Sequence, residues 1–343
     1  MKPLRAHMWH HAILILLLVV LMAMALTIGS SSISASQVIR SLFSSTGAVP
    51  DDIQLIILQV RLPRVCLAAI IGALLGISGT AIQGLFRNPL AEPSILGVTS
   101  GASLVTMLVL VIFPGLITFL GQWIGTFVIP LIACIGAIFA MLMVLLIQGR
   151  QSGSSANLIL AGIAVNLIAG AGISLCAYLA ADNQLRALTF WALGTLSAAS
   201  WQRVLVTGIT LLLVLPAFIR LSRALNVMLL GDSEARHMGF NIQWIRRLVI
   251  VLSSLAIASA VSFTGNIGFI GLVIPHINRM IFGPQHQHLF PLTAITGACL
   301  LVTADTLART IITPAEIPVG IITACIGGPF FIFLLTRNRR LAV

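Results

Sequence analysis

The sequence predicts an all-α protein that crosses a membrane several times. Of its 343 residues, 59% are hydrophobic and only 8% are charged, whereas soluble domains carry roughly a quarter charged residues. Apolar runs recur along the chain with about the 20 residues that a helix needs to cross the hydrocarbon core. The net charge is +11, but the basic residues stand singly or in pairs between these runs. That pattern is typical of topology signals and argues against nucleic-acid binding.

The apolar runs predict about ten transmembrane helices in one domain, residues 1–343. From run length we expect spans at about 12–30, 64–86, 94–113, 123–148, 157–181, 204–221, 248–264, 267–282, 289–308 and 317–336. The first run follows Lys2 and Arg5, so a secretory signal peptide is its alternative interpretation. The run is long for a signal peptide, and no good A-x-A cleavage site follows it.

An even number of spans places both chain ends on one side of the membrane. All but six of the 19 basic residues then fall on that side, which is cytoplasmic by the positive-inside rule. We therefore expect cytoplasmic termini at 1–11 and 337–343. The six basic residues on the outer side are Arg40, Arg61, Arg64, Arg186, Arg203 and Arg309.

The stretch 222–247 is the most polar part of the chain between two apolar runs, and the charge distribution places it in the cytoplasm. It holds Asp232 and Glu234, two of only eight acidic residues. Gly231 to Ser233 can begin a short helix through a side-chain N-cap, and Gly239 can end it as the C′ residue. We expect an amphipathic helix of about two turns. The residues alone leave open whether this is an ordinary polar loop or a docking element for a soluble partner.

Several chemistries are excluded or disfavoured by composition. Lys2 is the only lysine, so the chain cannot carry the lysine of a phosphate-binding P-loop, and any ATP that drives it is bound by another polypeptide. The five cysteines lie in apolar runs without metal-ligand spacing, as small buried hydrophobic residues do. No cluster of acids or metal ligands is apparent, so we expect no catalytic residues, no metal site and no cofactor in this chain.

Polar residues within or at the ends of the spans are candidates for function, because unpaired polarity is costly in lipid. Thr80, Gln83 and Asn166 are candidates for a translocation path, with hydrogen bonds between helices as the alternative interpretation. Asp305 precedes Arg309 by four residues, so the two are expected to form a local ion pair. This pairing argues against an ion-coupled secondary transporter, the rival class, which needs an ionisable group deep in the bundle.

Arginines at the outer mouth of the bundle also have two interpretations. Arg61 and Arg64 stand in RLPR and Arg309 in TADTLART. Long basic side chains can extend to lipid phosphates. Alternatively, their guanidinium groups can bind carboxylates of an acidic partner outside the cell membrane.

Four long motifs resemble the FecCD-type permease subunits of iron–siderophore, haem and cobalamin ABC importers. They are RLPRVCLAAIIGALLGISGTAIQGLFRNPLAEPSILGVTSGAS (61–103), LGDSEARHMGF (230–240), GNIGFIGLVIPHINRMIFGPQHQHLFP (265–291) and ADTLARTIITPAEIPVGIITACIGGPFFIFLL (304–335). The resemblance extends from about residue 55 to 336. It implies the type II ABC importer permease fold in the bacterial inner membrane. It also implies a homodimer with the path between the copies, two ATP-binding subunits that hold ATP and Mg, and a periplasmic substrate-binding protein.

The resemblance also implies roles for residues in this sequence. The loop 222–247 corresponds to the coupling helices that contact the ATPase, through Leu230, Gly231, Asp232, Glu234, Ala235, Arg236, Met238 and Gly239. Our hypothesis is that Asp232 and Glu234 cap and orient this helix, while the apolar side chains of Leu230 and Met238 fill a groove in the ATPase. Arg61, Arg64 and Arg309 match positions that pair with glutamates of the binding protein.

The cargo is predicted from segments that differ within the family. LILAGIAVNLIAGAGISL (158–175), NQLR (183–186) and PAEIPVGIITACIGGPFF (314–331) most resemble haem permeases. A ferric-siderophore permease is the alternative, with cobalamin less favoured.

Overall fold

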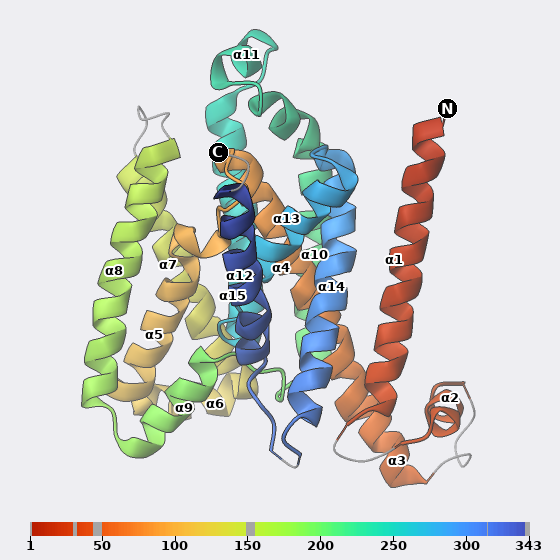
Figure 1. Cartoon of the computed structure of the whole chain (residues 1–343). Helices are drawn as coiled ribbons and strands as arrows, with labels where there is room; N and C mark the ends of the chain where they lie inside the picture. Colours follow the sequence, from red (N-terminus) through yellow and green to blue (C-terminus); the bar gives the residue numbers. More distant parts are fainter. Residues whose placement is uncertain (1, 30–32, 44–49, 149–154, 314, 340–343) are drawn as a thin grey trace.

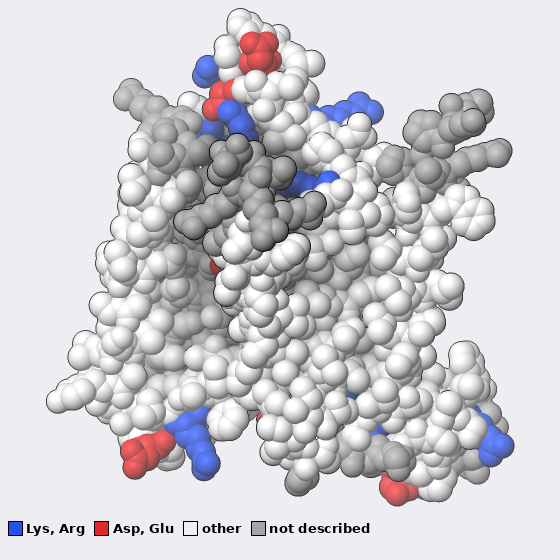
Figure 2. Space-filling model, in the orientation of Figure 1, with Lys and Arg blue, Asp and Glu red and all other residues white. Residues whose placement is uncertain are grey.

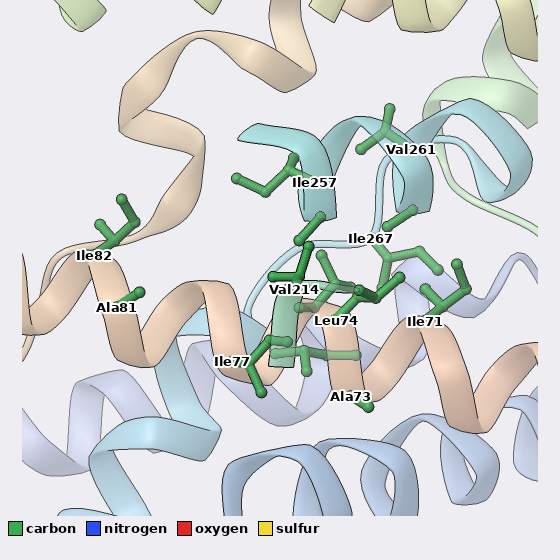
Figure 3. Packing of buried hydrophobic residues seen from close by; sticks show 14 of the residues in the cluster. Ile71, Ala73, Leu74, Ile77, Ala81, Ile82, Val214, Ile257, Val261 and Ile267 are labelled. Carbon is green, nitrogen blue, oxygen red and sulfur yellow. The ribbon is translucent and has the colours of Figure 1, made fainter. Parts of the chain in front are cut away.

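The helix α4 (Leu62–Phe86) lies at the centre of the bundle, and the other long helices are arranged around it. It is apolar on all sides, as expected of a helix surrounded by protein, and nearly all its side chains are buried. Helices α10 (Trp201–Met228), α12 (Ile242–Thr264), α13 (Ile270–Phe282) and α14 (His286–Thr310) pack against it. Figure 3 shows Ile71, Leu74 and Ile77 of α4 beside Val214 of α10 and Ile257 of α12.

The computed structural model describes residues 2–29, 33–43, 50–148, 155–313 and 315–339. Residue 30 of the first predicted span and residues 340–343 of the predicted cytoplasmic C-terminus lie outside these ranges, as does Pro314 of the fourth motif. Every regular element in the described part of the chain is helical, so the predicted all-α class is confirmed.

Two further groups of helices flank the central group. Helices α5 (Val98–Ile112), α7 (Val128–Gln148) and α8 (Ser155–Leu179) pack on one another, and α7 joins them to α12. On the opposite flank, α1 (Lys2–Thr27) packs along α14 (Figure 1). Helix α15 (Val319–Arg339) packs on α13 and α14.

The short helices divide between the two ends of the bundle. Figure 1 shows α2 (Ala35–Phe43), α3 (Asp51–Leu55), α6 (Pro114–Ile124) and α9 (Asp182–Ala192) at one end. At the other end α11 (Asp232–His237) projects beyond the long helices, and α1 begins and α15 ends on that side. A π-helical turn (Ile56–Arg61) joins α3 to α4, and 3-10 turns occupy Pro93–Leu96 and Gly125–Phe127. The arrangement agrees with an even number of crossings.

Seven helical runs in the described residues are long and apolar enough to cross a membrane. They are Trp9–Thr27, Asp51–Phe86, Pro114–Ile147, Asn157–Leu179, Trp201–Met228, Ile242–Thr264 and His286–Thr310. The other three predicted spans coincide with shorter apolar helices, Val98–Ile112, Ile270–Phe282 and Val319–Phe333. The multi-pass character is therefore confirmed, whereas the count of ten crossings stays a prediction.

Small residues allow the central helices to approach closely. A Cβ atom added to Gly72 would overlap the carbonyl oxygen of Gly297 in α14, and one added to Gly79 would overlap the carbonyl group of Gly271 in α13. Backbones in this contact leave no room for any side chain, which is how small residues promote helix packing in lipid.

Replacing Gly79 by alanine should destabilise the protein by about 1–3 kcal/mol, since α4 and α13 must separate to admit the methyl group. The thermal unfolding midpoint of the purified chain measures this. Gly170→Ala in α8 is the matched control, because nothing lies within 4 Å of a Cβ placed there and alanine is the better helix former. Equal midpoints for the two variants would contradict the close α4–α13 contact.

Candidate functional site

Helix α11 has the short form that the sequence predicts, and glycines bound it on both sides. Gly231 precedes it with a φ of 137° and Gly239 follows it with a φ of 85°. The N–H of Phe240 donates to the carbonyl of Ala235 at 3.0 Å, which is the hydrogen bond that closes a helix at a left-handed C′ residue. The helix itself covers Asp232 to His237.

The predicted capping role of Asp232 is wrong. The N-cap residue is Gly231, and no side chain caps the helix start. Asp232 already lies in the first helical turn, and its carboxylate instead pairs with Arg87 at the end of α4 and with Arg246 of α12, the latter at 3.1 Å. Glu234 is exposed in the same turn, where a negative charge is favoured by the helix dipole.

The surface of α11 is apolar at the positions expected to contact a partner. Leu230, just before the helix, is 72% exposed, and Met238, just after it, is 62% exposed. Ala235 is the buried residue of the helix. A cavity of about 400 Å³ lies beside α11, and it is lined by Asp232, Arg236, Gly239, Phe240, Asn241, Ile242, Gln243 and Arg246.

At the opposite end of the bundle, Arg64 lies between two carboxylates. Its Nε and Nη2 atoms donate to Asp305 Oδ1 at 3.0 and 2.9 Å, and its Nη1 atom donates to Glu316 at 3.0 Å. Asp305 also pairs with Arg309 Nε at 3.1 Å. The predicted local pair of Asp305 and Arg309 is therefore confirmed, and it is part of a larger cluster that joins α4 to α14.

Arg61 and Arg309 bind the C-terminal end of α1. Arg61 Nη1 donates to the carbonyls of Leu26 and Thr27 at 2.7 and 3.1 Å, and Arg309 donates to those of Ala25 and Ile28 at 3.2 Å. Cations at a helix C-terminus satisfy its free carbonyls and favour its dipole.

These three arginines are largely buried within the chain. Arg61, Arg64 and Arg309 are 5%, 8% and 6% exposed, because the carboxylates and the carbonyl groups of α1 draw the guanidinium groups inward. Their docking role stays a prediction.

The polar residues predicted for the path form hydrogen bonds between helices. Thr80 and Gln83 are fully buried. Thr80 Oγ1 donates to Thr293 Oγ1 at 3.0 Å, and Gln83 Nε2 donates to the carbonyl of Leu272 at 3.1 Å. Asn166, half-buried, accepts from Ser100 Oγ at 2.6 Å. For Thr80 and Gln83 the structure favours the alternative interpretation, since neither reaches a surface of the chain.

Sequence reasoning missed several residues that the fold brings to these sites. Arg279 of α13 donates to Gln83 Oε1 at 3.1 Å and to the carbonyl of Thr80 at 3.2 Å. Arg87 and Phe269 are the non-glycine residues with positive φ in the described ranges. Of these residues, only Phe269 has a signal in the sequence, because it lies in the Gly-rich run 265–271 that interrupts an apolar stretch.

A second cavity, of about 450 Å³, lies at the break between α12 and α13. It is lined by Ala192, Leu193, Asn266, Gly268, Phe269, Gly320, Ile321, Ala324 and Cys325. The N–H of Phe269 donates to Glu92 Oε1 at 3.3 Å. Among the described residues, no three histidine, cysteine or acidic side chains gather in a way that could hold a metal ion.

Comparison with known proteins places this architecture in a family. The model of the FecCD transport family matches residues 16–337. This chain belongs to the FecCD transport family. Members of this family are permease subunits of ABC importers, and they are not enzymes, because ATP hydrolysis resides in a separate subunit.

Relatives of this FecCD permease cover almost its whole length. It is 40% identical to the hemin transport system permease protein HmuU of Yersinia pestis over 95% of both chains. It is 36% identical to the vitamin B12 import system permease protein BtuC of Vibrio vulnificus (strain CMCP6) over 94% of both chains. A solved metal-chelate type ABC transporter in an inward-facing conformation matches with a TM-score of 0.81 and 34% identity, over 95% of this chain and 98% of that one.

Proposed function

We propose that this FecCD permease moves haem, or another iron chelate, across the bacterial inner membrane, driven by ATP hydrolysis on a partner. The observation that carries the proposal is α11, which projects from one end of the bundle with exposed Leu230 and Met238. In an ABC importer this end faces the ATPase. Figure 2 shows charged side chains gathered at the two ends, with a largely uncharged belt between them, as a membrane-spanning protein requires.

The proposed topology has ten crossings of a single domain, residues 1–343. Segments 1–11, 222–247 and 337–343 are cytoplasmic, and the cluster of Arg61, Arg64 and Arg309 faces the periplasm. The excess of basic residues on the side of α11 supports this orientation.

The proposed assembly is a homodimer with two ATP-binding subunits below it and a periplasmic substrate-binding protein above it. ATP and Mg are bound by the partner subunits. Helix α8 supports a further contact surface, because only 28% of the residues in its most apolar stretch are buried, against 83% in the helical run that contains α4. We propose that lipid and the second copy cover such faces, and that the 450 Å³ cavity contributes to the path between the copies.

Haem is the proposed cargo because the chain is 40% identical to the Yersinia pestis hemin permease and 36% identical to the Vibrio vulnificus vitamin B12 permease, over nearly its whole length in both cases. A ferric siderophore is the alternative, and cobalamin a less favoured one. The test is uptake by the permease–ATPase complex in proteoliposomes with binding proteins loaded with haemin, a ferric siderophore or cobalamin. Uptake of a siderophore without haemin would reject the haem proposal.

An ion-coupled secondary transporter is the rival from another class. Asp305, the acid inside a span, is paired with Arg64 and Arg309, which opposes a coupling role. We expect uptake to continue when a protonophore collapses the proton gradient, provided that ATP is maintained. Loss of uptake under those conditions would favour the rival.

A further inference from the structure

Arg87 adopts a backbone conformation that its side chain disfavours. It follows the last residue of α4 with a φ of 51°. Its N–H donates to the carbonyl of Gly84 at 3.3 Å, and the N–H of Asn88 donates to that of Gln83 at 3.2 Å. This is the left-handed helix ending that glycine usually supplies. A side chain in the left-handed region costs conformational energy, so an arginine at this position calls for a reason beyond the turn.

The side chain of Arg87 supplies that reason. Its Nη2 atom binds Oδ1 of Asp232, the first residue of α11, while Oδ2 of the same carboxylate accepts from Arg246. The Arg87 side chain is 38% exposed, so the core does not require it. A glycine would build the same turn without strain, but it would break the link between α4 and α11.

Helix α11 packs on α10 and α12, the two helices that precede and follow it in the chain. Ala235 is its one buried residue in the described chain, and the 400 Å³ cavity lies beside it. The ion pair of Asp232 with Arg87 links α11 directly to α4, and the same carboxylate binds Arg246 in α12.

Helix α4 can carry such a displacement through the whole bundle. Its 25 residues span about 37 Å, and it is buried along nearly all its length. At its far end Arg64 binds Asp305 and Glu316. A buried, continuous helix moves as a unit more readily than it bends, since close-packed interiors are bistable and not continuously deformable.

We propose that Arg87 is a positioning residue that fixes α11 to the end of α4, so that displacement of α11 by the ATPase moves α4 as one body. The inference rests on the proposed function of α11 as the ATPase contact. Arg87 itself acts within this chain and does not bind the partner.

Three substitutions separate the ion pair from the backbone strain. Arg87→Gly removes both, Arg87→Gln removes only the charge, and Arg87→Lys keeps the charge. The full complex, purified through a tag on this chain and reconstituted in vesicles, is assayed for haemin or ferric citrate moved per ATP hydrolysed. Co-purification of the ATPase and the unfolding midpoint are measured on the same samples. Arg186→Gln, at the opposite end of the bundle in α9, is the charge-removal control.

We expect Arg87→Gly and Arg87→Gln to lower cargo moved per ATP by about tenfold, a usual size for coupling between sites. Arg87→Lys should restore much of it, and the ATPase should co-purify as with the unaltered chain. The Arg87→Gly midpoint should be no lower than that of the parent, because strain is relieved. The proposal is overturned if either neutral variant transports normally, or if coupling and co-purification fall together. Failure of the proposed function gives a different result. In that case the ATPase would still co-purify with a chain that carries Leu230→Asp.

Discussion

Replacing Asp305 by alanine should destabilise the protein by roughly 3–5 kcal/mol, the usual cost of removing one partner from a buried ion pair. The carboxylate is 2% exposed and pairs with Arg64 and Arg309, whose side chains are 10% and 6% exposed. Without Asp305, these two guanidinium groups repel each other in a site with little water. The unfolding midpoint of the purified chain in detergent measures the loss.

Glu316→Gln is the matched control within the same cluster. Glu316 also binds Arg64, but its side chain is 39% exposed, so removing its charge should cost no more than about 1 kcal/mol. Equal losses in the two variants would show that burial does not decide the strength of this cluster. A stable Asp305→Ala variant would show that the arginines can be solvated, and this would favour the docking role that the family resemblance implies for them.

The sequence predicts the features of this chain that depend on neighbouring residues. The apolar runs locate the helices, and glycine positions predict where α11 ends. The spacing of Asp305 and Arg309 predicts their ion pair, because residues four apart share one helix face.

Contacts between distant segments account for the features that the sequence does not predict. Asp232 has the sequence context of a helix cap, but Arg87 lies 145 residues away along the chain and only the fold brings it near. Arg64 and Asp305 are 241 residues apart, so nothing local indicates that the outer arginines are buried. Thr80 and Gln83 stand out as path candidates because their polarity is visible in the sequence, whereas their hydrogen-bond partners on α13 and α14 are not.

Replacing both Leu230 and Met238 by aspartate should reduce ATPase assembly and ATP-driven uptake by about two orders of magnitude or more. Anchors in the centre of an interface each contribute about 2 kcal/mol or more. Both residues are exposed in the chain alone, so the substitutions remove no buried contact and the fold should persist. The expected result is therefore an inserted protein of normal unfolding midpoint that no longer retains the ATPase. Co-purification of the ATPase and uptake by vesicles are the two measurements.

Ile39→Asp on α2 is the control, because it tests an exposed apolar residue at the opposite end of the bundle. Ile39 is 59% exposed, a fraction similar to the 62% of Met238. Its replacement should leave the ATPase bound. Loss of assembly in both variants would indicate a general defect of insertion. Retention in both would show that the exposed apolar face of α11 does not bind the ATPase, because an interface anchor cannot accept a buried unpaired carboxylate without a large loss of affinity.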